Sequence, residues 1–379
     1  MNKLRCSNIR NLCILAKHIE NNVRIFTRKV YLRGLIEISN ICRKSCLYCG
    51  IRCGNCAVQR YELSDEQILQ EAQFALDAGY GSVVLQGGER TDSAYVERIA
   101  RLVRQIKELR PGEGCGFATG NNIGTDFNPR QPLGITLSLG EQSREVYKEW
   151  YDAGAHRYLL RIEASNRQLY EKIHPSDSEI EKKMHSYDAR VQALHDLKSV
   201  GYITGSGVMI GLPYQTHENL DEDLKFFKEF GVDMVGMGPY IPHKETPLGR
   251  LVLQEWEKKK RGETYADLGE FAFMDDSEKL ELSIDMVRRL REMMPHINIA
   301  ATTALQVLDP DGREKAVLAG ANVIMPNITE TGQRKNYQLY EGKPGVNDDA
   351  ASTKLQLEAN LDKIGVSIGW WQVGDPQRV

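Results

Sequence analysis

Long apolar runs, blocks of like charge and a secretory leader are all missing from this sequence. No apolar stretch approaches the roughly 20 residues that span a bilayer, so we expect no membrane-spanning helix. There is no run of five or more like charges, and a net charge of -3 offers no basic face to nucleic acid or anionic lipid. Residues 1–30 lack the apolar core and small-residue cleavage site of a signal peptide. We therefore expect a cytoplasmic protein with a small-molecule partner and with no nucleic-acid or membrane partner.

Several motifs of nucleotide and metal chemistry are also absent. We find no Walker A run, no H-E-x-x-H and no complete Rossmann fingerprint, since Gly236-x-Gly238 lacks the third glycine. The eight cysteines lie in the first third of the chain, and the last of them is Cys115. This distribution is poor for stapling a chain of 379 residues with disulfides. It favours metal or redox use of the thiols.

Short strand-like and longer helix-like segments alternate from Tyr31 onward. The strand-like segments are rich in β-branched or aliphatic residues, and the helix-like segments carry an apolar stripe. Eight such pairs predict an α/β fold, a (β/α)8 TIM barrel with its site on the C-terminal face of the strands. A chain of this length commonly forms such a barrel as one domain. The predicted strands are 32–38, 82–85, 135–139, 158–162, 204–210, 234–237, 297–301 and 322–325.

The predicted helices lie between these strands. The first begins at a capping box from Ser64 to Gln67 and stops at Gly79. Two loops interrupt the alternation, one rich in Gly, Pro and Asn at about 110–132 and one polar and charged at about 249–275. We interpret both as insertions into a barrel of residues 31–379, preceded by a helical N-terminal extension of residues 1–30.

Three cysteines, Cys42, Cys46 and Cys49, follow the first predicted strand with the spacing C-x3-C-x2-C. Three thiolates on one loop can hold three irons of a 4Fe-4S cluster, normally a four-cysteine set, and leave the fourth iron open for an external ligand. A structural zinc site needs four ligands, usually in two separated pairs. Inert thiols are the other alternative, but the position at a barrel strand end favours the cluster. Cys53 and Cys56 follow Cys49 with the same x3 and x2 spacing, and we interpret them as ordinary reduced thiols rather than metal or redox groups.

With Tyr48 directly before the third cysteine, the motif resembles the signature of radical S-adenosylmethionine enzymes. Later segments resemble that family's other motifs in the expected order: Gln86 to Glu89 its G-G-E segment, and Gly207 to Pro213 its G-x-I-x-G segment. Glycines at such positions let the backbone approach a ligand closely. The resemblance implies a cluster whose open iron is chelated by S-adenosylmethionine. It implies cluster ligation by Cys42, Cys46 and Cys49, and cofactor contacts from Tyr48, Gln86, Gly87, Gly88, Glu89 and Met209.

Longer blocks resemble one branch of that family, the HydE maturases of FeFe-hydrogenase, more than biotin synthase or methylornithine synthase. They are residues 137–141 with 157–166, residues 236–247, and residues 301–303 through 321–327 to 337–340. Some members of the branch carry an accessory cluster on C-terminal cysteines, which this chain lacks after Cys115. The resemblance implies that Ser138, Glu163 and Arg190 contact S-adenosylmethionine and that Arg161, Thr302, Thr303, Tyr337 and Tyr340 line the substrate cavity.

The resemblance implies an enzyme that cleaves S-adenosylmethionine reductively to a 5'-deoxyadenosyl radical, in assembly of the diiron subcluster of the hydrogenase H-cluster. It implies an organometallic iron or small thiol-containing substrate, an electron donor such as ferredoxin or flavodoxin, and other hydrogenase maturases as partners. One alternative is a methylornithine synthase-like amino-acid mutase or another radical enzyme like biotin synthase. A second is an iron-sulfur carrier that binds no S-adenosylmethionine.

Several of the implied site residues also have plain structural interpretations. Arg161 and Glu163 share parity on their strand, so both point into the barrel, where they bind a charged ligand or pair with each other. Ordinary strand or packing roles remain open for Thr302, Thr303, Tyr337 and Tyr340, and we interpret the lone loop histidines His174 and His243 as structural or solvent-exposed.

Overall fold

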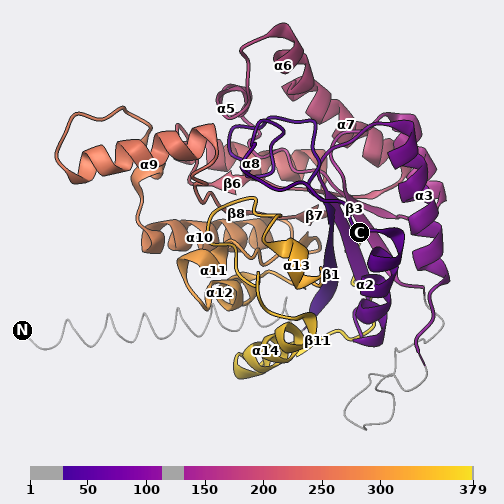
Figure 1. The fold of residues 1–379 in the computed structure, drawn as a ribbon. Helices are drawn as coiled ribbons and strands as arrows, with labels where there is room; N and C mark the ends of the chain where they lie inside the picture. Colours follow the sequence, from indigo (N-terminus) through magenta and orange to yellow (C-terminus); the bar gives the residue numbers. More distant parts are fainter. Residues whose placement is uncertain (1–28, 113–131, 378–379) are drawn as a thin grey trace, which may run out of the picture.

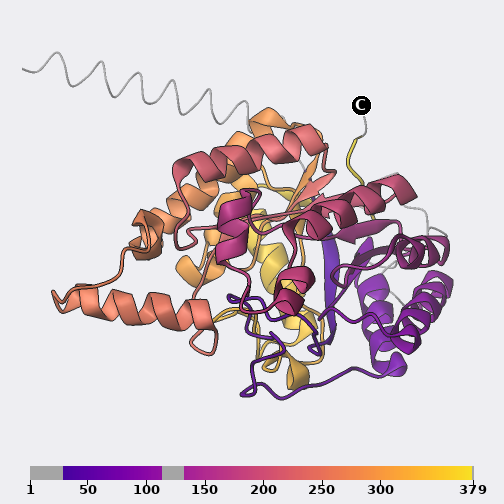
Figure 2. The same cartoon turned by 90° about the horizontal axis from the view of Figure 1, so that it is seen from above.

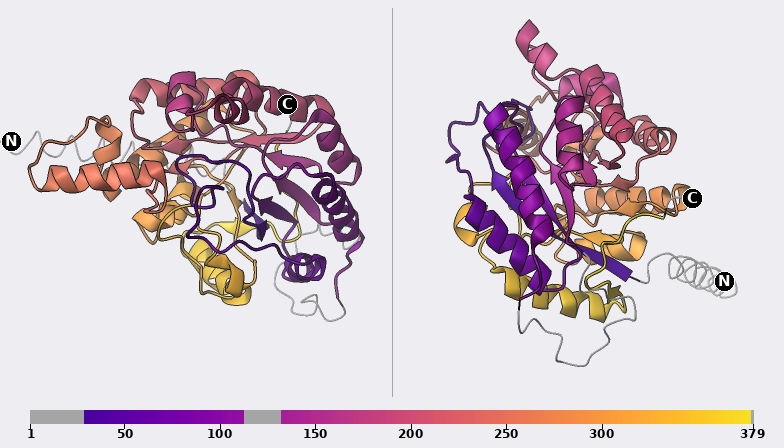
Figure 3. Two further views of the ribbon diagram at one scale, coloured as in Figure 1. Left: turned by 45° about the horizontal axis from the view of Figure 1, so that its top comes forward. Right: turned by 90° about the vertical axis from the view of Figure 1, so that its right-hand side faces the viewer.

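A computed structural model describes residues 29–112 and 132–377 of the chain. Nearly all of the predicted N-terminal extension and most of the predicted insertion at 110–132 lie outside these residues, as do Cys6, Cys13 and Cys115. In the described part, helices surround a central ring of strands, which Figure 1 shows from the side and Figure 2 from above. Figure 3 shows the same arrangement from two further sides.

Eight parallel strands of the described residues form this ring. Each pairs with the next in the order β1, β2, β3, β4, β5, β7, β9, and β10 pairs with β1. A bridge between Ala300 and Val323 joins β9 to β10, and the amide of Asn322 donates to the carbonyl oxygen of Ile299 at 2.9 Å. The ring is therefore closed, and the predicted (β/α)8 barrel is confirmed. Its strands are β1 (Lys29–Ser39), β2 (Ser82–Gly87), β3 (Gly134–Ser138), β4 (Arg157–Leu159), β5 (Ile203–Ser206), β7 (Met234–Val235), β9 (Asn298–Ile299) and β10 (Val323–Ile324).

The predicted strand 204–210 is divided in the structure. β5 ends at Ser206, and β6 (Met209–Ile210) pairs with β8 (Gly238–Pro239) beyond the end of β7. The division falls at Gly207, where an added Cβ would lie 2.0 Å from the carbonyl oxygen of Gly236. Two backbones that approach this closely leave no room for a side chain, so glycine is required and the regular pairing is interrupted.

The helices pack on the outside of the ring through apolar faces. In the first of them, the Ser64 side chain accepts from the Gln67 amide and the Gln67 side chain accepts from the Ser64 amide, which confirms the predicted capping box. The helices are α2 (Asp65–Asp77), α3 (Ser93–Glu108), α4 (Arg144–Asp152), α5 (Arg167–Lys172), α6 (Glu179–Met184), α7 (Tyr187–Val200), α8 (His217–Phe230), α9 (Pro247–Lys260), α10 (Asp276–Met293), α11 (Leu305–Leu308), α12 (Gly312–Ala319), α13 (Thr331–Arg334) and α14 (Ala350–Lys363).

The segment predicted as the insertion at 249–275 contains helix α9 and a 3-10 turn, η1 (Glu270–Phe273). The free end of α9 projects from the barrel at the left of Figure 1. Its first turns are anchored, because Leu248 and Val252 are buried in an apolar cluster against which Leu47 and Tyr48 of the cysteine loop pack. The amide of Leu248 also donates to the carbonyl oxygen of Leu47 at 3.0 Å. This segment therefore supports the cysteine loop from outside.

The C-terminal segment crosses the opposite end of the barrel. After β11 (Ser367–Ile368), which pairs with β1, the carboxylate of Asp375 accepts from Nε of Arg157 at 2.6 Å. The carbonyl oxygen of Gly374 accepts from Nδ2 of Asn298 at 2.7 Å. These contacts cover the N-terminal ends of the strands, so the C-terminal ends form the accessible face. Within the described residues, no helix combines the length and apolar character needed to cross a bilayer.

Candidate active site

The predicted cluster ligands lie on the loop between β1 and α2, at the C-terminal face of the barrel. The two ends of this loop lie side by side, because Ser39 and Glu62 form an antiparallel bridge. Cys42, Cys46 and Cys49 are each partly buried. Burial and the neighbouring thiol of Cys42 raise the pKa of Cys46 to about 12, although Arg190 and Lys44 oppose this shift.

The charges of neighbouring thiols affect the pKa of Cys46 and Cys49. Burial raises the pKa of Cys49 well above its usual value, and the charges of Cys46 and Cys42 raise it further. Bare thiolates would repel each other here, whereas a bound cation compensates that repulsion and deprotonates coordinating thiols outright. The arrangement fits a site in which the three cysteines act together on iron.

Backbone amides complete the surroundings of Cys42. The amides of Lys44 and Glu89 donate to its Sγ at 3.4 and 3.3 Å, which are the kind of contacts that tune cluster sulfurs. The described residues contain no group of three or more His, Cys, Asp or Glu side chains placed to hold a single metal ion. A structural zinc ion would need four such ligands around it. Cys53 and Cys56 are free and exposed, and Cys53 Sγ donates to the hydroxyl of Ser45 at 3.3 Å.

The segment Gln86 to Glu89 lies directly beside the cysteine loop. The amide of Gly88 donates to the carbonyl oxygen of Ser39 at 3.0 Å, and a Cβ at Gly88 would lie 2.3 Å from the carbonyl oxygen of Ile41. Glycine is therefore needed here for close contact with the loop itself. Glu89 is buried, and its carboxylate accepts from Nε of Arg43 at 2.9 Å.

A row of four alternating charges runs behind the cysteine loop. Lys44 Nζ lies 3.6 Å from the carboxylate of Glu89 and 2.8 Å from that of Glu141, which also pairs with Arg190. Burial opposes ionisation of Glu141, but Arg190 and Lys44 together hold its pKa at about 2. The row joins the cysteine loop to the ends of β2 and β3 and to α7. The sequence indicates roles for Glu89 and Arg190, but it carries no signal for Lys44 and Glu141.

The two charged residues beyond β4 form an ion pair. Arg161 binds the Glu163 carboxylate through Nε at 2.9 Å and Nη2 at 3.0 Å, and its Nη1 donates to the carbonyl oxygen of Gly236 at 2.8 Å. The pairing that the sequence left open is therefore present. Yet 29% of the Arg161 side chain stays exposed. Glu163 has a φ of 67°, a left-handed conformation that costs a non-glycine residue about 1–3 kcal/mol and is typical of functional sites.

The other predicted site residues lie on the same face of the barrel. Tyr337 is buried, and its hydroxyl accepts from Nε2 of Gln86 at 3.3 Å. The Thr302 hydroxyl donates to the carbonyl oxygen of Met237 at 3.1 Å. Most of the set is partly exposed: Gln86, Gly87, Ser138, Met209, Thr302, Thr303 and Tyr340.

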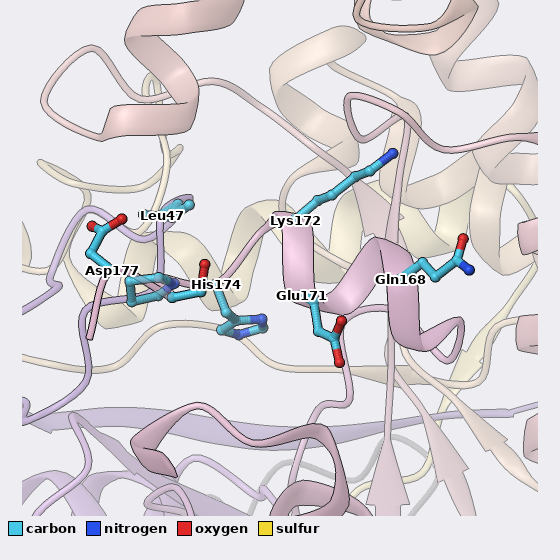
Figure 4. A pocket seen from close by; sticks show the side chains of 8 residues that line it. Leu47, Gln168, Glu171, Lys172, His174 and Asp177 are labelled. Atoms are coloured by element: carbon cyan, nitrogen blue, oxygen red, sulfur yellow. The ribbon is translucent and has the colours of Figure 1, made fainter. Parts of the chain in front are cut away.

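Tyr48 of the cysteine loop packs against His174, which follows α5. Its ring meets that of His174 edge-on, with centroids 5.5 Å apart, and the Tyr48 hydroxyl lies 3.4 Å from His174 Nε2. His174 and His243 are both buried, as expected for structural histidines. A surface pocket of about 510 Å³ opens beside this contact (Figure 4) and is lined by Leu47, Gln168, Glu171, Lys172, His174, Pro175, Ser176 and Asp177. None of the predicted site residues lines it.

Comparisons with known proteins agree with this geometry. The model of the Radical SAM superfamily matches residues 36–227. The chain is 41% identical to the [FeFe] hydrogenase maturase subunit HydE of Thermotoga maritima over 316 residues, 83% of this chain and 75% of that protein. It is 23% identical to the 3-methylornithine synthase of Methanosarcina acetivorans over 333 residues, 88% of this chain and 79% of that protein. A crystal structure of methylornithine synthase superposes with a TM-score of 0.65 at 22% identity, covering 93% of this chain and 87% of that one, which shows a shared fold.

Proposed function

Because this chain belongs to the Radical SAM superfamily and, within it, to the HydE family of FeFe-hydrogenase maturases, we propose that it acts in assembling the diiron subcluster of the hydrogenase H-cluster. The superfamily uses a 4Fe-4S cluster and S-adenosylmethionine, so the protein is an enzyme with radical chemistry. When bound, the cluster supplies one electron that cleaves the sulfonium of S-adenosylmethionine to methionine and a 5'-deoxyadenosyl radical.

The observation that carries this proposal is the C-x3-C-x2-C spacing of Cys42, Cys46 and Cys49 on the loop that follows β1. These thiols would hold three irons, and the fourth iron is left for S-adenosylmethionine. The backbone amides of Lys44 and Glu89 donate to Sγ of Cys42, and these hydrogen bonds favour the thiolate form of Cys42. Gly87 and Gly88 would bring backbone against the cofactor's methionine part, with Gln86 beside them, and Tyr48 and Met209 would lie near its adenine.

Glu163 and Arg190 are proposed to bind S-adenosylmethionine together with Ser138. In this structure Arg161 holds Glu163, and Glu141 pairs with Arg190. A charged ligand that enters here must share or replace these ion pairs. A zwitterionic methionine group brings one ammonium, which can pair with a carboxylate, and one carboxylate, which can pair with a guanidinium. Its binding would therefore leave no buried charge unpaired.

The substrate is proposed to lie deeper, against Arg161, Thr302, Thr303, Tyr337 and Tyr340. A guanidinium and hydroxyls suit an anionic or cyanide-like group, and an organometallic iron or small thiol-containing molecule would present one. The proposed partners are other hydrogenase maturases and an electron donor such as ferredoxin or flavodoxin. We also propose that the protein works in the cytoplasm.

The runner-up activity is an amino-acid mutase like methylornithine synthase. Identity of 41% to HydE against 23% to 3-methylornithine synthase favours the maturase. An iron-sulfur carrier is the non-enzyme alternative, and it predicts that S-adenosylmethionine does not bind.

The test is activation of apo-hydrogenase in vitro by the reconstituted protein with its partner maturases. We expect hydrogen evolution that depends on this protein and on S-adenosylmethionine. Conversion of lysine to methylornithine, without hydrogenase activation, would establish the mutase instead.

A further inference from the structure

We propose that Arg60 is a positioning residue that holds the cysteine loop in the shape in which Cys42, Cys46 and Cys49 meet a cluster. The inference rests on the proposed ligation of iron by these three thiols. Arg60 itself touches neither the thiols nor the predicted cofactor residues, and it lies on the returning arm of the loop, just before the bridge of Glu62 with Ser39.

The Arg60 guanidinium donates to backbone carbonyl oxygens on both arms of the loop. One acceptor precedes Cys42, and the others follow Cys49. The planar group therefore ties the beginning of the loop to its end. Its acceptors are Asn40 at 2.7 Å and Ile51 at 2.7 Å through Nη1, and Arg52 at 2.6 Å, Asn55 at 3.1 Å and Cys53 at 3.4 Å through Nη2.

Two asparagines complete the closure around this guanidinium. The side chain of Asn40 accepts from the amide of Tyr61 at 2.8 Å and donates to the carbonyl oxygen of Gln59 at 2.8 Å. The side chain of Asn55 donates to the carbonyl oxygen of Gly50 at 2.7 Å. The loop contains little regular pairing of its own, so these side chains satisfy backbone groups that strands or helices satisfy elsewhere.

The chemistry requires an arginine. A guanidinium presents five N–H donors in one rigid plane and reaches acceptors on opposite sides. A lysine ammonium keeps the charge but has only three donors, all on one atom, so it cannot satisfy the five carbonyls that Nη1 and Nη2 reach. Loss of Arg60 would remove the donor that the carbonyl oxygens of Asn40 and Ile51 share, and the loop would open. Residues that orient metal ligands in this way typically contribute about 10–100-fold in metal affinity or activity.

The first test uses the full chain without iron. Hydrogen exchange of residues 40–61 is compared in the wild type, Arg60→Lys, Arg60→Ala and a control, Arg104→Lys, whose side chain is exposed on α3. We expect both Arg60 variants to exchange at least about tenfold faster in this loop, with unchanged exchange in β2 to β5 and an unchanged far-UV circular dichroism spectrum. Wild-type protection of the loop in Arg60→Ala would overturn the proposal. So would equal loss of protection throughout the barrel, because the role would then be general stability.

The second test measures iron and sulfide bound after anaerobic reconstitution. We expect Arg60→Lys and Arg60→Ala to lose most of the bound iron, and millimolar guanidinium, but not methylammonium, to restore it in Arg60→Ala. Full iron loading in a variant whose loop exchanges freely would contradict a role in presenting the thiols. If the wild type itself bound no cluster, the proposed function would fail, while the exchange experiment would still report on the Arg60 contacts.

Discussion

The guanidinium of Arg161 binds both carboxylate oxygens of Glu163, with Nε 2.9 Å from Oε1 and Nη2 3.0 Å from Oε2. The pair lies where the proposed cofactor and substrate positions meet, and it fixes a carboxylate whose backbone is in a left-handed conformation. We propose that Arg161 contributes both to substrate binding and to the orientation of Glu163.

Replacing Arg161 with Lys tests this coupling. Lysine keeps the charge but loses the bidentate geometry. We expect the dissociation constant of S-adenosylmethionine to rise by about tenfold, equivalent to about 1.4 kcal/mol. Equilibrium dialysis against the reconstituted variant measures it. An unchanged affinity would show that Glu163 is oriented without Arg161.

Glu141 should stabilise the fold through the charges on either side of it. Glu141→Gln leaves Lys44 and Arg190 buried with one fewer counter-charge, which we expect to lower the free energy of unfolding by about 3 kcal/mol. Urea unfolding of the iron-free chain measures the loss. Asp152→Asn, which breaks the exposed pair with Lys148, is the control and should change stability by no more than about 0.5 kcal/mol. Similar small effects in both variants would mean that the row of charges contributes little.

Asp223 should make stability depend on pH. Burial raises its pKa to about 7, although its carboxylate accepts from the amide and hydroxyl of Ser165. A folded-state pKa above the unfolded value of about 3.9 means that the contribution is complete below pH 4 and is lost as pH rises toward 7. We expect the wild type to lose up to about 4 kcal/mol of stability relative to Asp223→Asn over this interval. Parallel pH profiles of the two proteins in urea unfolding would refute the assignment.

Gly88 should be indispensable for cluster binding. An alanine Cβ there would press on the carbonyl oxygen of Ile41 at 2.3 Å and on Cβ of Cys42 at 2.6 Å, so the cysteine loop would have to move. We expect Gly88→Ala to reduce the iron bound on reconstitution by about tenfold. Gly332→Ala is the matched control, since the nearest atom to its added Cβ is 4.0 Å away. Equal iron content in the two variants would contradict the steric argument.

Local sequence patterns predicted the barrel well because each strand and helix carries its own periodicity. The helix predicted from the capping box at Ser64 to the stop at Gly79 is α2 (Asp65–Asp77) in the structure. Patterns failed where a distant segment decides the structure. The strand predicted over 204–210 is divided at Gly207 because Gly236 approaches it closely. The segment at about 249–275 is polar and charged and is interpreted as an insertion, yet it contains most of helix α9, whose Leu248 and Val252 are buried in the cluster against which Leu47 and Tyr48 pack.

In the site, too, local motifs can be predicted from the sequence, whereas roles that depend on distant partners cannot. The cysteine spacing and the glycines of the second strand are visible in the sequence. The roles of Lys44, Glu141 and Arg60 are not, because a charged residue in a loop looks exposed until its partners are known. Lys44 is buried only because Glu89 and Glu141, from two other strand ends, supply its counter-charges.

Cluster ligation and S-adenosylmethionine cleavage are tested most directly by 5'-deoxyadenosine formation in the anaerobically reconstituted protein, supplied with S-adenosylmethionine and a strong reductant. We expect the wild type and Cys56→Ser to form 5'-deoxyadenosine, and Cys46→Ser to form none, because the three-thiol site is then incomplete. Continued formation of 5'-deoxyadenosine by reconstituted Cys46→Ser would contradict the central claim that Cys42, Cys46 and Cys49 together hold the cluster that cleaves S-adenosylmethionine.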